Sequence, residues 1–319
     1  MSSRSVLGGR AHTSTRVDPR HRAAGRLDRV PEPVSARPLS VDVIDIDDPD
    51  DPRVDDFRDL NSVDRRPDLP TLPGGRPGKG LVIAEGVLVA QRMIASRFAP
   101  HAFLGVDKRL TELADDLRAP GLSGVPFYRA SADVMAQIVG FHLNRGVLGV
   151  ARRPVGLQVD DVLATARTIA VLEGVNDHEN IGSIFRNAAG LGVDAVLFGS
   201  GCADPLYRRC VRVSMGHALL VPHARFDDWR GALDVLAEHG FTTVALTPRE
   251  SAVPLADAVS ADKVAVLVGA EGPGLSEAAI RGSHIAARIP MSRGTDSLNV
   301  ATAAAIAFYE RVRSGTITG

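Results

Sequence analysis

The sequence predicts an α/β protein in which a small α/β domain precedes a larger domain built on a parallel sheet. With 319 residues, of which 45% are hydrophobic, the chain is long enough for two domains with their own cores. From Leu81 onward, short β-prone runs alternate with helical patterns. Several C-terminal runs, such as residues 264–268, are apolar at every position, which is typical of strands buried on both faces of a parallel sheet.

The first 80 residues contain few apolar clusters and are expected to lie outside both domains. Residues 1–40 contain eight Arg against three acidic residues, and residues 41–59 contain nine Asp against two Arg. We therefore predict a disordered extension over residues 1–60 that is first basic and then acidic. Frequent Pro and Gly predict a linker over residues 61–80. Because the charges of the extension offset each other, the formal net charge of -1 does not exclude a nucleic-acid partner.

Residues 81–155 are predicted to form the small α/β domain. Its strands are expected at residues 81–84, 102–106, 125–128 and 146–151, and its helices at residues 86–98, 110–117 and 131–139. Nine basic residues against six acidic ones allow one face of this domain to be positively charged. An ordinary α/β domain with solvated arginines is the alternative.

Residues 156–319 are predicted to form a doubly wound α/β layer, with ligand sites at the carboxyl ends of its strands. Strands are expected at residues 168–172, 195–198, 218–221, 242–246, 264–268 and 285–289, and helices at residues 181–191, 205–213, 228–238, 276–281 and 298–313. A dinucleotide-binding dehydrogenase is disfavoured, because the first strand is followed by Glu173-Gly174-Val175-Asn176 and not by a G-x-G-x-x-G turn.

The remaining residue types exclude several other classes of protein. Cys202 and Cys210 are the only cysteines, too few for a disulfide framework or a thiolate metal site. No apolar run approaches the roughly 20 residues that cross a bilayer, and the N-terminus lacks an apolar signal segment. We therefore expect a cytoplasmic protein that binds neither a membrane nor a metal.

Three segments of the C-terminal half carry the functional information. They are Asn-Ile-Gly-Ser-Ile-Phe-Arg at 180–186, Gly-Ala-Glu-Gly-Pro-Gly-Leu at 269–275, and Ser-Leu-Asn-Val-Ala-Thr-Ala at 297–303. In this order they resemble the signature motifs of the SpoU/TrmH branch of SPOUT RNA methyltransferases, and the resemblance spans about residues 166–314. It implies a catalytic domain with a trefoil knot, which would make it one of the rare exceptions to unknotted folds.

The resemblance also implies an activity and its partners. The reaction would be methylation of a ribose 2′-hydroxyl in structured rRNA or tRNA, with S-adenosyl-L-methionine as the cofactor. The catalytic domain (156–319) would form a homodimer, and residues 81–155 would be an RNA substrate-binding domain. A non-catalytic RNA-binding protein that keeps the SPOUT fold is the alternative.

The cofactor site implied by the resemblance is walled largely by backbone groups of the loops that follow the strands. Glycine at two of its positions would permit a close approach and positive φ angles. The residues expected to bind the cofactor are Leu246, Thr247, Gly269, Ala270, Glu271, Gly272, Gly274, Ile289, Pro290, Met291 and Leu298.

The residues expected to take part in catalysis are Asn180, Arg186, Glu271, Ser297 and Asn299. The resemblance assigns Arg186 to the reacting hydroxyl, either as a base of depressed pKa or as a clamp on the hydroxyl and a substrate phosphate. The clamp is favoured, because a guanidinium has a pKa above about 12. We expect Arg186 and Asn180 on the same side of a helix that begins near Ile181, with Asn180 as its N-cap.

The other members of this set have more than one possible role. Ser297 is expected to begin the last helix and to bind a phosphate there. Asn299 would hold either the ribose or Asn180. Glu271 would stabilise a positive charge or form a salt bridge with Arg186 or Lys263. His178 is a possible general base, although lone histidines are more often structural.

Six arginines are candidates for contacts with RNA phosphates, namely Arg92, Arg145, Arg152, Arg153, Arg208 and Arg212. The first four belong to the small domain or its end, and the last two belong to a basic helix ahead of Ser214-Met215-Gly216. A solvated helix face is the alternative for that helix.

Overall fold

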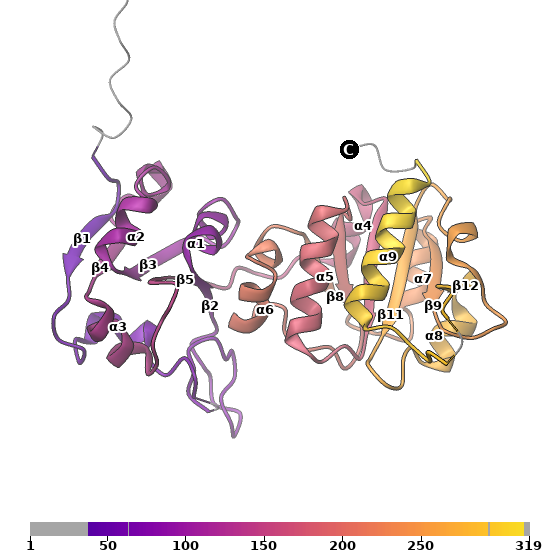
Figure 1. Cartoon of the computed structure of the whole chain (residues 1–319), viewed down its shortest axis with the longest axis horizontal. Coiled ribbons are helices and arrows are strands. Elements are labelled where there is room, and N and C mark those ends of the chain that lie inside the picture. Colours follow the sequence, from indigo (N-terminus) through magenta and orange to yellow (C-terminus); the bar gives the residue numbers. More distant parts are fainter. Residues whose placement is uncertain (1–37, 63, 293, 316–319) are drawn as a thin grey trace, which may run out of the picture. The chain divides into compact units, whose positions relative to one another are not determined.

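The computed structural model describes residues 38–315 except 63 and 293, and these belong to one compact unit that contains two sheets (Figure 1). The disorder expected for residues 1–37 therefore falls outside the described residues. None of the helices in the described part of the chain has the length and apolar character of a membrane span.

The N-terminal sheet is mixed and has the strand order β1-β4-β3-β5-β2. Its strands are β1 (Asp42–Asp45), β2 (Leu81–Glu85), β3 (Pro100–Gly105), β4 (Pro126–Arg129) and β5 (Val147–Arg152). Its helices are α1 (Val87–Ile94), α2 (Asp107–Glu112) and α3 (Ala132–Val139), with short 3₁₀ helices η2 (Pro52–Phe57), η3 (Asp116–Arg118) and η4 (Pro120–Leu122). Strand β5 runs antiparallel to both β3 and β2, whereas β1, β4 and β3 are parallel. Helices α1 and α2 pack on one face, and α3 and η2 pack on the other.

The prediction of a disordered extension is wrong for residues 38–60. Strand β1 pairs with β4, and η2 buries Val54 and Phe57 in the core of the sheet. The acidic residues do not prevent this, because the carboxylates of β1 lie on the exposed side of an edge strand, where Asp45 pairs with Arg129. Ile46, directly after β1, is buried at 1% exposure.

The predicted linker over residues 61–80 is an ordered arm. Its two ends are held together by hydrogen bonds from Gly78 N to Pro70 O and from Gly80 N to Leu69 O, and an isolated bridge joins Thr71 to Pro77. Asp68 is 4% exposed, and its carboxylate accepts a hydrogen bond from the backbone of Arg208 at 3.0 Å. The arm is therefore part of the folded structure.

The C-terminal sheet is entirely parallel and has the order β10-β12-β9-β11-β6-β7-β8. Its strands are β6 (Thr168–Glu173), β7 (Ala195–Phe198), β8 (His223–Arg225), β9 (Thr242–Leu246), β10 (Val253–Pro254), β11 (Val264–Gly269) and β12 (Ile285–Arg288). Its helices are α4 (Val159–Thr165), α5 (His178–Gly190), α6 (Arg208–Val213), α7 (Ala232–Glu238), α8 (Glu277–Gly282) and α9 (Val300–Arg313), with 3₁₀ helices η5 (His217–Leu219) and η6 (Leu255–Asp257). The predicted α/β fold with a parallel sheet is confirmed.

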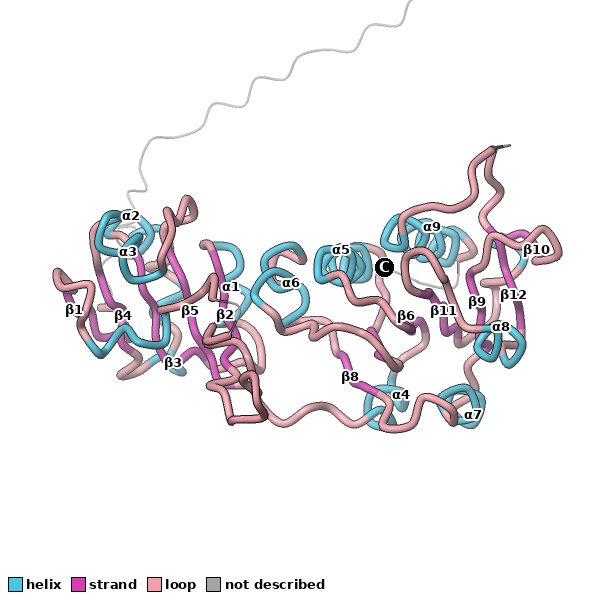
Figure 2. The backbone as a smooth tube through the Cα atoms, turned by 90° about the horizontal axis from the view of Figure 1, so that it is seen from below, coloured by secondary structure: helices cyan, strands magenta, loops and turns pink. Residues whose placement is uncertain are grey.

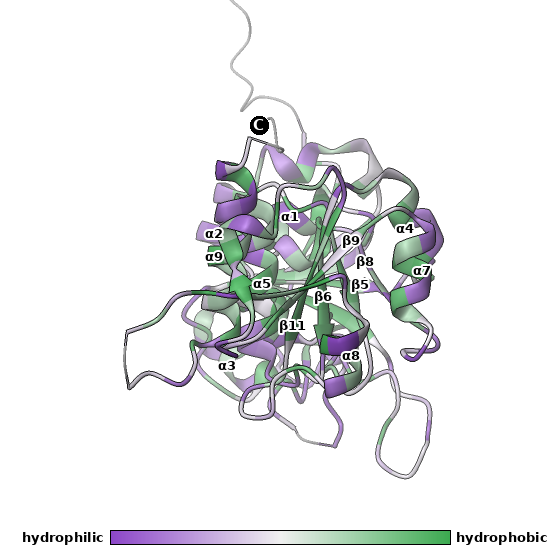
Figure 3. Ribbon diagram, turned by 90° about the vertical axis from the view of Figure 1, so that its right-hand side faces the viewer, coloured by the Kyte–Doolittle hydropathy of each residue, from purple (hydrophilic) through white to green (hydrophobic). Residues whose placement is uncertain are grey.

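Helices cover both faces of this parallel sheet. Figure 2 shows α5 and α9 on one side of the strands and α4 and α7 on the other. The two cores agree with this view, since one contains residues of α5 and α9 and the other contains residues of α4, α7 and α8. Figure 3 shows the central strands coloured as hydrophobic, while the helices carry both colours. Strands buried on both faces explain the uninterrupted apolar runs of the sequence.

Several predicted boundaries differ from the structure. Residues 218–221, expected as a strand, overlap η5, and the strand comes later as β8. Helix α5 begins at His178 with Asp177 as its N-cap, so Asn180 is not the cap. Helix α9 begins at Val300, where the Asn299 side chain is the N-cap in place of Ser297.

An apolar cluster connects the two sheets. It combines residues of β2, α1 and β5 with residues of and near α6, and its members are Val82, Ala84, Val89, Met93, Phe98, Ala151, Leu206, Val211 and Leu219. Helix α9 is fixed at its other end by Arg311, which is fully buried and donates to the backbone oxygens of Val259 (2.8 Å) and Asp262 (2.6 Å). Buried hydrogen bonds of this kind hold the helix that carries Asn299 at its start.

Candidate functional site

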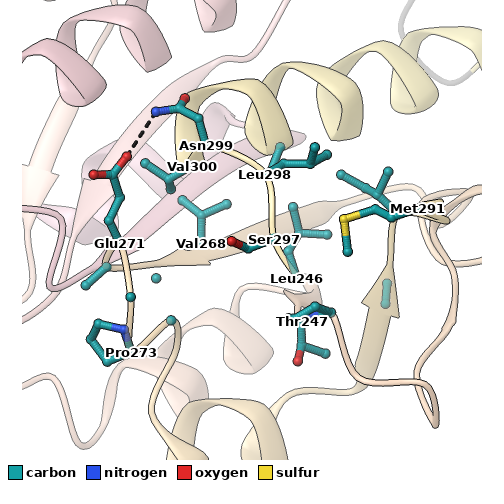
Figure 4. Close-up of a pocket in the computed structure, with 18 residues that line it drawn as sticks. Leu246, Thr247, Val268, Glu271, Pro273, Met291, Ser297, Leu298, Asn299 and Val300 are labelled. Atoms are coloured by element: carbon teal, nitrogen blue, oxygen red, sulfur yellow. Dashed lines mark hydrogen bonds between the residues drawn. The ribbon is translucent and has the colours of Figure 1, made fainter. Parts of the chain in front are cut away.

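A cavity of about 420 Å³ opens at the carboxyl ends of β9, β11 and β12 (Figure 4). Its lining residues are Leu246, Thr247, Pro248, Val268, Gly269, Ala270, Glu271, Gly272, Pro273, Gly274, Ala287, Ile289, Met291, Ser297, Leu298, Asn299, Val300 and Ala303. All the residues predicted to bind a cofactor are among them except Pro290. The volume lies within the range of roughly 300–1,000 Å³ that is usual for small-molecule sites.

The glycine-rich loop forms one wall of the cavity by folding back on the end of β11. Gly274 N donates to Ala270 O at 2.9 Å, which closes the loop after Gly269. A Cβ at Gly269 would collide with the backbone of Gly274 and Leu275, so only glycine permits this closure. Gly272, at φ 84°, has open space around it. The loop therefore presents backbone groups to the cavity.

Three polar side chains from three distant segments meet at one end of the cavity. Asn180 Nδ2 donates to Glu271 Oε1 at 2.9 Å, and Asn299 Nδ2 donates to the same oxygen at 3.0 Å. Asn299 Nδ2 also donates to Asn180 Oδ1 at 2.8 Å. Figure 4 shows Glu271 and Asn299 facing each other, with Met291 at the opposite side of the cavity. The expected pairing of Asn299 with Asn180 is present.

Each amide in this network is itself held in place. The Asn299 side-chain oxygen accepts hydrogen bonds from Ala301 N (3.0 Å) and Thr302 N (3.1 Å), which fixes its amide nitrogen toward Glu271. Asn180 is 7% exposed and also donates to the Asp177 carboxylate at 3.3 Å. The network is therefore preorganised by the starts of α5 and α9.

Glu271 does not form either of the salt bridges that were considered from the sequence. Its Oε1 accepts only from the two asparagine amides, and Lys263 instead donates to His239 O at 3.2 Å. Within the described residues, its second oxygen has no hydrogen-bond donor. The carboxylate thus has one oxygen available to a ligand in the cavity.

Arg186 is not among the residues that line the cavity. Because α5 begins at His178, six residues of helix turn Arg186 about 120° away from Asn180 and carry it about 9 Å along the axis. The expectation that both lie on the same side of the helix is therefore wrong. Asn187, the next residue, faces α9 and donates to Ala301 O at 3.1 Å. Arg186 is exposed, and no described side chain pairs with it.

Two further candidates have local structural contacts or none. Ser297 lines the cavity as an exposed residue. His178 packs against the ring of Tyr207, with 4.2 Å between ring centroids, and burial lowers the pKa of its imidazole. His178 does not line the cavity. In the described part of the chain, His, Cys, Asp and Glu side chains do not gather into a group that could bind a metal ion.

Comparisons with known proteins identify the family. A family profile described as the SpoU rRNA Methylase family matches residues 167–309. A Mycobacterium bovis protein, named as an uncharacterized tRNA/rRNA methyltransferase, is 67% identical over 281 residues, which are 87% of this chain and 94% of that protein. The chain belongs to the SpoU rRNA methylase family.

Other relatives of this SpoU family member are more distant. A 23S rRNA (guanosine-2′-O-)-methyltransferase of Vibrio parahaemolyticus is 30% identical over 212 residues, which are 65% of this chain and 84% of that protein. A solved structure of an AdoMet-bound rRNA methyltransferase from Sinorhizobium meliloti matches with a TM-score of 0.68 at 22% identity, covering 85% of this chain and 98% of that one. At that identity the match shows a shared fold.

The six candidate arginines of this SpoU protein differ in how far contacts within the protein already occupy them. Arg208 is largely buried, with 11% of its side chain exposed, and donates to Glu85 at 2.9 Å. Arg153 pairs with Asp204 at 2.7 Å and donates to Asp68 O. Arg212 and Arg145 lie 3.4 Å and 3.9 Å from Glu85. Arg152 is exposed, and Arg92 donates to Met215 O at 2.5 Å. Arg208 and Arg153 are therefore occupied by internal contacts.

Sequence reasoning did not name several residues that build the SpoU site. Pro248, Val300 and Ala303 line the cavity, and Asp177 supports Asn180. A signal for Asp177 was present, because an Asp immediately before the first helical residue is a common N-cap pattern. The apolar lining residues carry no such signal.

Proposed function

We propose that this chain methylates a ribose 2′-hydroxyl in structured rRNA or tRNA, with S-adenosyl-L-methionine as the methyl donor. The observation that carries the proposal is the Asn180–Glu271–Asn299 network at the edge of a glycine-walled cavity, since it unites residues of all three motif segments. The family relationship and the 2′-O-methyltransferase name of the Vibrio relative support the same reaction.

The residues of the cavity fit this donor. Leu246, Ile289 and Leu298 offer apolar surface for an adenine ring, and the backbone of residues 269–274 offers donors and acceptors for polar groups. Leu298 is 37% exposed although it is apolar, as expected for a side chain that a ligand covers. When bound, S-adenosyl-L-methionine supplies a methyl group on a positively charged sulfur. Glu271, the one carboxylate in the lining, would favour such a charge nearby.

The chain's own groups would then position the hydroxyl and the phosphate that receives its proton. We assign Asn180, Asn299 and Ser297 to holding the ribose at the mouth of the cavity, because alignment of the reacting atoms supplies much of the rate. Arg186 would hold the flanking phosphate and the hydroxyl with its planar set of donors. In that arrangement the hydroxyl proton passes to a phosphate oxygen, and the guanidinium stays charged.

Arg186 does not line the cavity, so the bound RNA would extend from the cavity toward the exposed face of α5.

A homodimer through the C-terminal domain would cover Tyr309, an apolar residue of α9 that is 56% exposed. We also propose that the last strands and helix of the C-terminal domain thread back through a loop as a trefoil knot, in keeping with the family. The N-terminal α/β sheet would bind the substrate RNA.

The donor site is tested by calorimetric titration of S-adenosyl-L-methionine into the full-length protein and its Gly269→Ala variant. The new Cβ meets the backbone of Gly274 and Leu275, so the loop must move and binding should weaken by at least about 10-fold. Gly156→Ala is the control, because a Cβ there has no neighbour within 4 Å. Unchanged affinity in the Gly269 variant would remove the cavity from the proposal. A wild-type protein that binds RNA but not the donor would favour the non-catalytic alternative.

A further inference from the structure

Three basic side chains from separate segments lie together outside the cavity. They are Arg92 on α1, Arg186 on α5, and His217 in η5, which follows the turn at residues 214–216. The elements are in contact, since α5 packs against η5 and α1 also touches it. Arg92 Nη1 donates to Met215 O at 2.5 Å, which places the Arg92 guanidinium at the turn, two residues from His217.

The turn is built to accept Arg92. Met215 has a φ of 56°, one of two non-glycine residues with positive φ in the described chain, and such a conformation costs on the order of 1 kcal/mol. Gly216 follows at φ 87°, and a Cβ there would lie 3.2 Å from Arg92 Cβ. The turn that ends α6 therefore leaves room for the Arg92 stem and holds its guanidinium through Met215 O.

The three side chains have no acidic partner. Within the described residues, none of them forms an ion pair, and the only hydrogen bond made by any of their side chains is that of Arg92 to Met215 O. Burial and the nearby Arg186 lower the pKa of Arg92. Burial, then Arg92 and Arg186, lower the pKa of His217. Mutual repulsion of this kind is released when an anion binds.

We infer that Arg92, Arg186 and His217 form one binding site for an RNA phosphodiester, to which Arg92 is contributed by helix α1 of the N-terminal half. This inference rests on the proposed function, because it assigns the phosphate that Arg186 holds. Two guanidinium groups provide planar donor pairs for phosphate oxygens, and a neutral imidazole provides one more donor. The N-terminal half would then help to place the reacting nucleotide of the RNA, and would also add to the affinity for RNA.

The first test measures the salt dependence of binding to poly(U), a single-stranded RNA, because a phosphate contact does not depend on sequence. Arg92→Met removes the charge at nearly constant length, and Arg92→Lys retains the charge without the planar donors. The Met variant should bind about 10-fold more weakly and lose about 0.7 from the slope of log affinity against log salt. The Lys variant should keep the slope and lose only several-fold in affinity.

Lys108→Gln is the matched control, because Lys108 lies on α2 of the same sheet with a side chain that is 77% exposed. Its slope and affinity should equal those of the wild type. If Arg92→Met has the wild-type slope and affinity for poly(U), the inference is overturned.

The second test needs neither RNA nor methyl transfer. The titration of the His217 ring is followed by NMR in the full-length protein, with and without inorganic pyrophosphate as the anion. Pyrophosphate should raise the pKa of His217 in the wild type, and Arg92→Met should raise it in the absence of pyrophosphate, since one repelling charge is gone. A His217 titration that pyrophosphate does not shift would contradict the site.

The two tests separate this inference from the proposed function. If the wild-type protein fails to bind S-adenosyl-L-methionine while pyrophosphate still shifts His217, the proposed reaction fails and the anion site stands. If the donor binds and methyl transfer proceeds equally well in wild type and Arg92→Met, with an unshifted His217, the anion site fails and the reaction stands.

Discussion

Two groups of arginines lie on or beside helix α6 and the turn that follows it. They differ in whether a carboxylate lies among them. In the first group, Arg208, Arg212 and Arg145 surround Glu85, whose side chain is 7% exposed. In the second, Arg92 and Arg186 lie beside His217 with no described acidic partner. The same residue type therefore serves two purposes around one helix and the turn that follows it.

This difference indicates that a surface for nucleic acid is marked by arginines without a neutralising carboxylate, and not by the number of arginines. A carboxylate buried among guanidinium groups satisfies charges that join β2 to α6, so this group stabilises the fold. A basic group without such a partner keeps a positive potential that an incoming phosphate can use. We expect mutations in the two groups to separate stability from RNA binding.

The largest effect is expected from Glu85→Gln. Loss of the carboxylate leaves Arg208, which is 11% exposed, without its charged partner, and the free energy of unfolding should fall by about 3–5 kcal/mol. Urea denaturation followed by circular dichroism measures this change. Arg145→Gln is the control, because that pair is 3.9 Å long with a half-exposed arginine and should be worth less than about 1 kcal/mol. Equal losses in both variants would show that Glu85 does not hold the two sheets together.

The second prediction concerns the group without a carboxylate. Arg186→Ala should lower methyl transfer by on the order of 100-fold or more, while the unfolding free energy stays within about 0.5 kcal/mol. Arg186 is exposed and has no partner to lose among the described residues. Arg209→Ala is the matched control, since Arg209 is an exposed arginine paired with Glu179 on the surface. Near-normal turnover of the Arg186 variant in a radiolabelled methyl-transfer assay would remove its role.

The third prediction extends the comparison to two histidines. Burial lowers the pKa of His223 to about 4, and its ring packs against Phe185 and Phe198. Because the folded pKa lies below the usual 6.5, the unfolded chain takes up the proton first, so stability is present above about pH 6.5 and is lost as the pH falls toward 4. The loss attributable to His223 should be about 2 kcal/mol at pH 5.

His223→Phe should flatten this part of the pH profile, measured by denaturation at a series of pH values. His217 lies beside the two arginines of the second group, so His217→Gln should alter RNA binding more than the stability profile. A His223 variant with the wild-type loss of stability between pH 6.5 and 4 would contradict the burial argument.

The sequence was sufficient for the parallel sheet and for the convergence of Asn180, Glu271 and Asn299. The apolar runs indicated the strands. The three motif segments come at or after the carboxyl ends of strands, where a parallel sheet brings loops together. It was insufficient where two local signals competed. Asp177 and Asn180 are both good N-cap residues, and the structure uses Asp177, which moves the start of α5. The expected shared side for Asn180 and Arg186 failed for another reason, because six residues of an α-helix leave two side chains about 120° apart.

Long-range pairing accounts for the other differences. Strand β1 is acidic and would not be stable alone, but it adds to the edge of β4, and Arg129 offsets the charge of Asp45. The sequence suggests that Arg208 is a surface residue of a basic helix. In the structure it lies beside Glu85, which is 123 residues away in the sequence. Local composition does not contain that information.

The most direct measurement of the central claim is the salt dependence of poly(U) binding for two matched variants, Arg92→Met and Arg212→Met. Each change removes one guanidinium from a neighbouring helix, one from the group without a carboxylate and one from the group around Glu85. We predict a slope lower by about 0.7 for Arg92→Met and an unchanged slope for Arg212→Met. Equal changes in the two variants, or a change in Arg212→Met alone, would contradict the account.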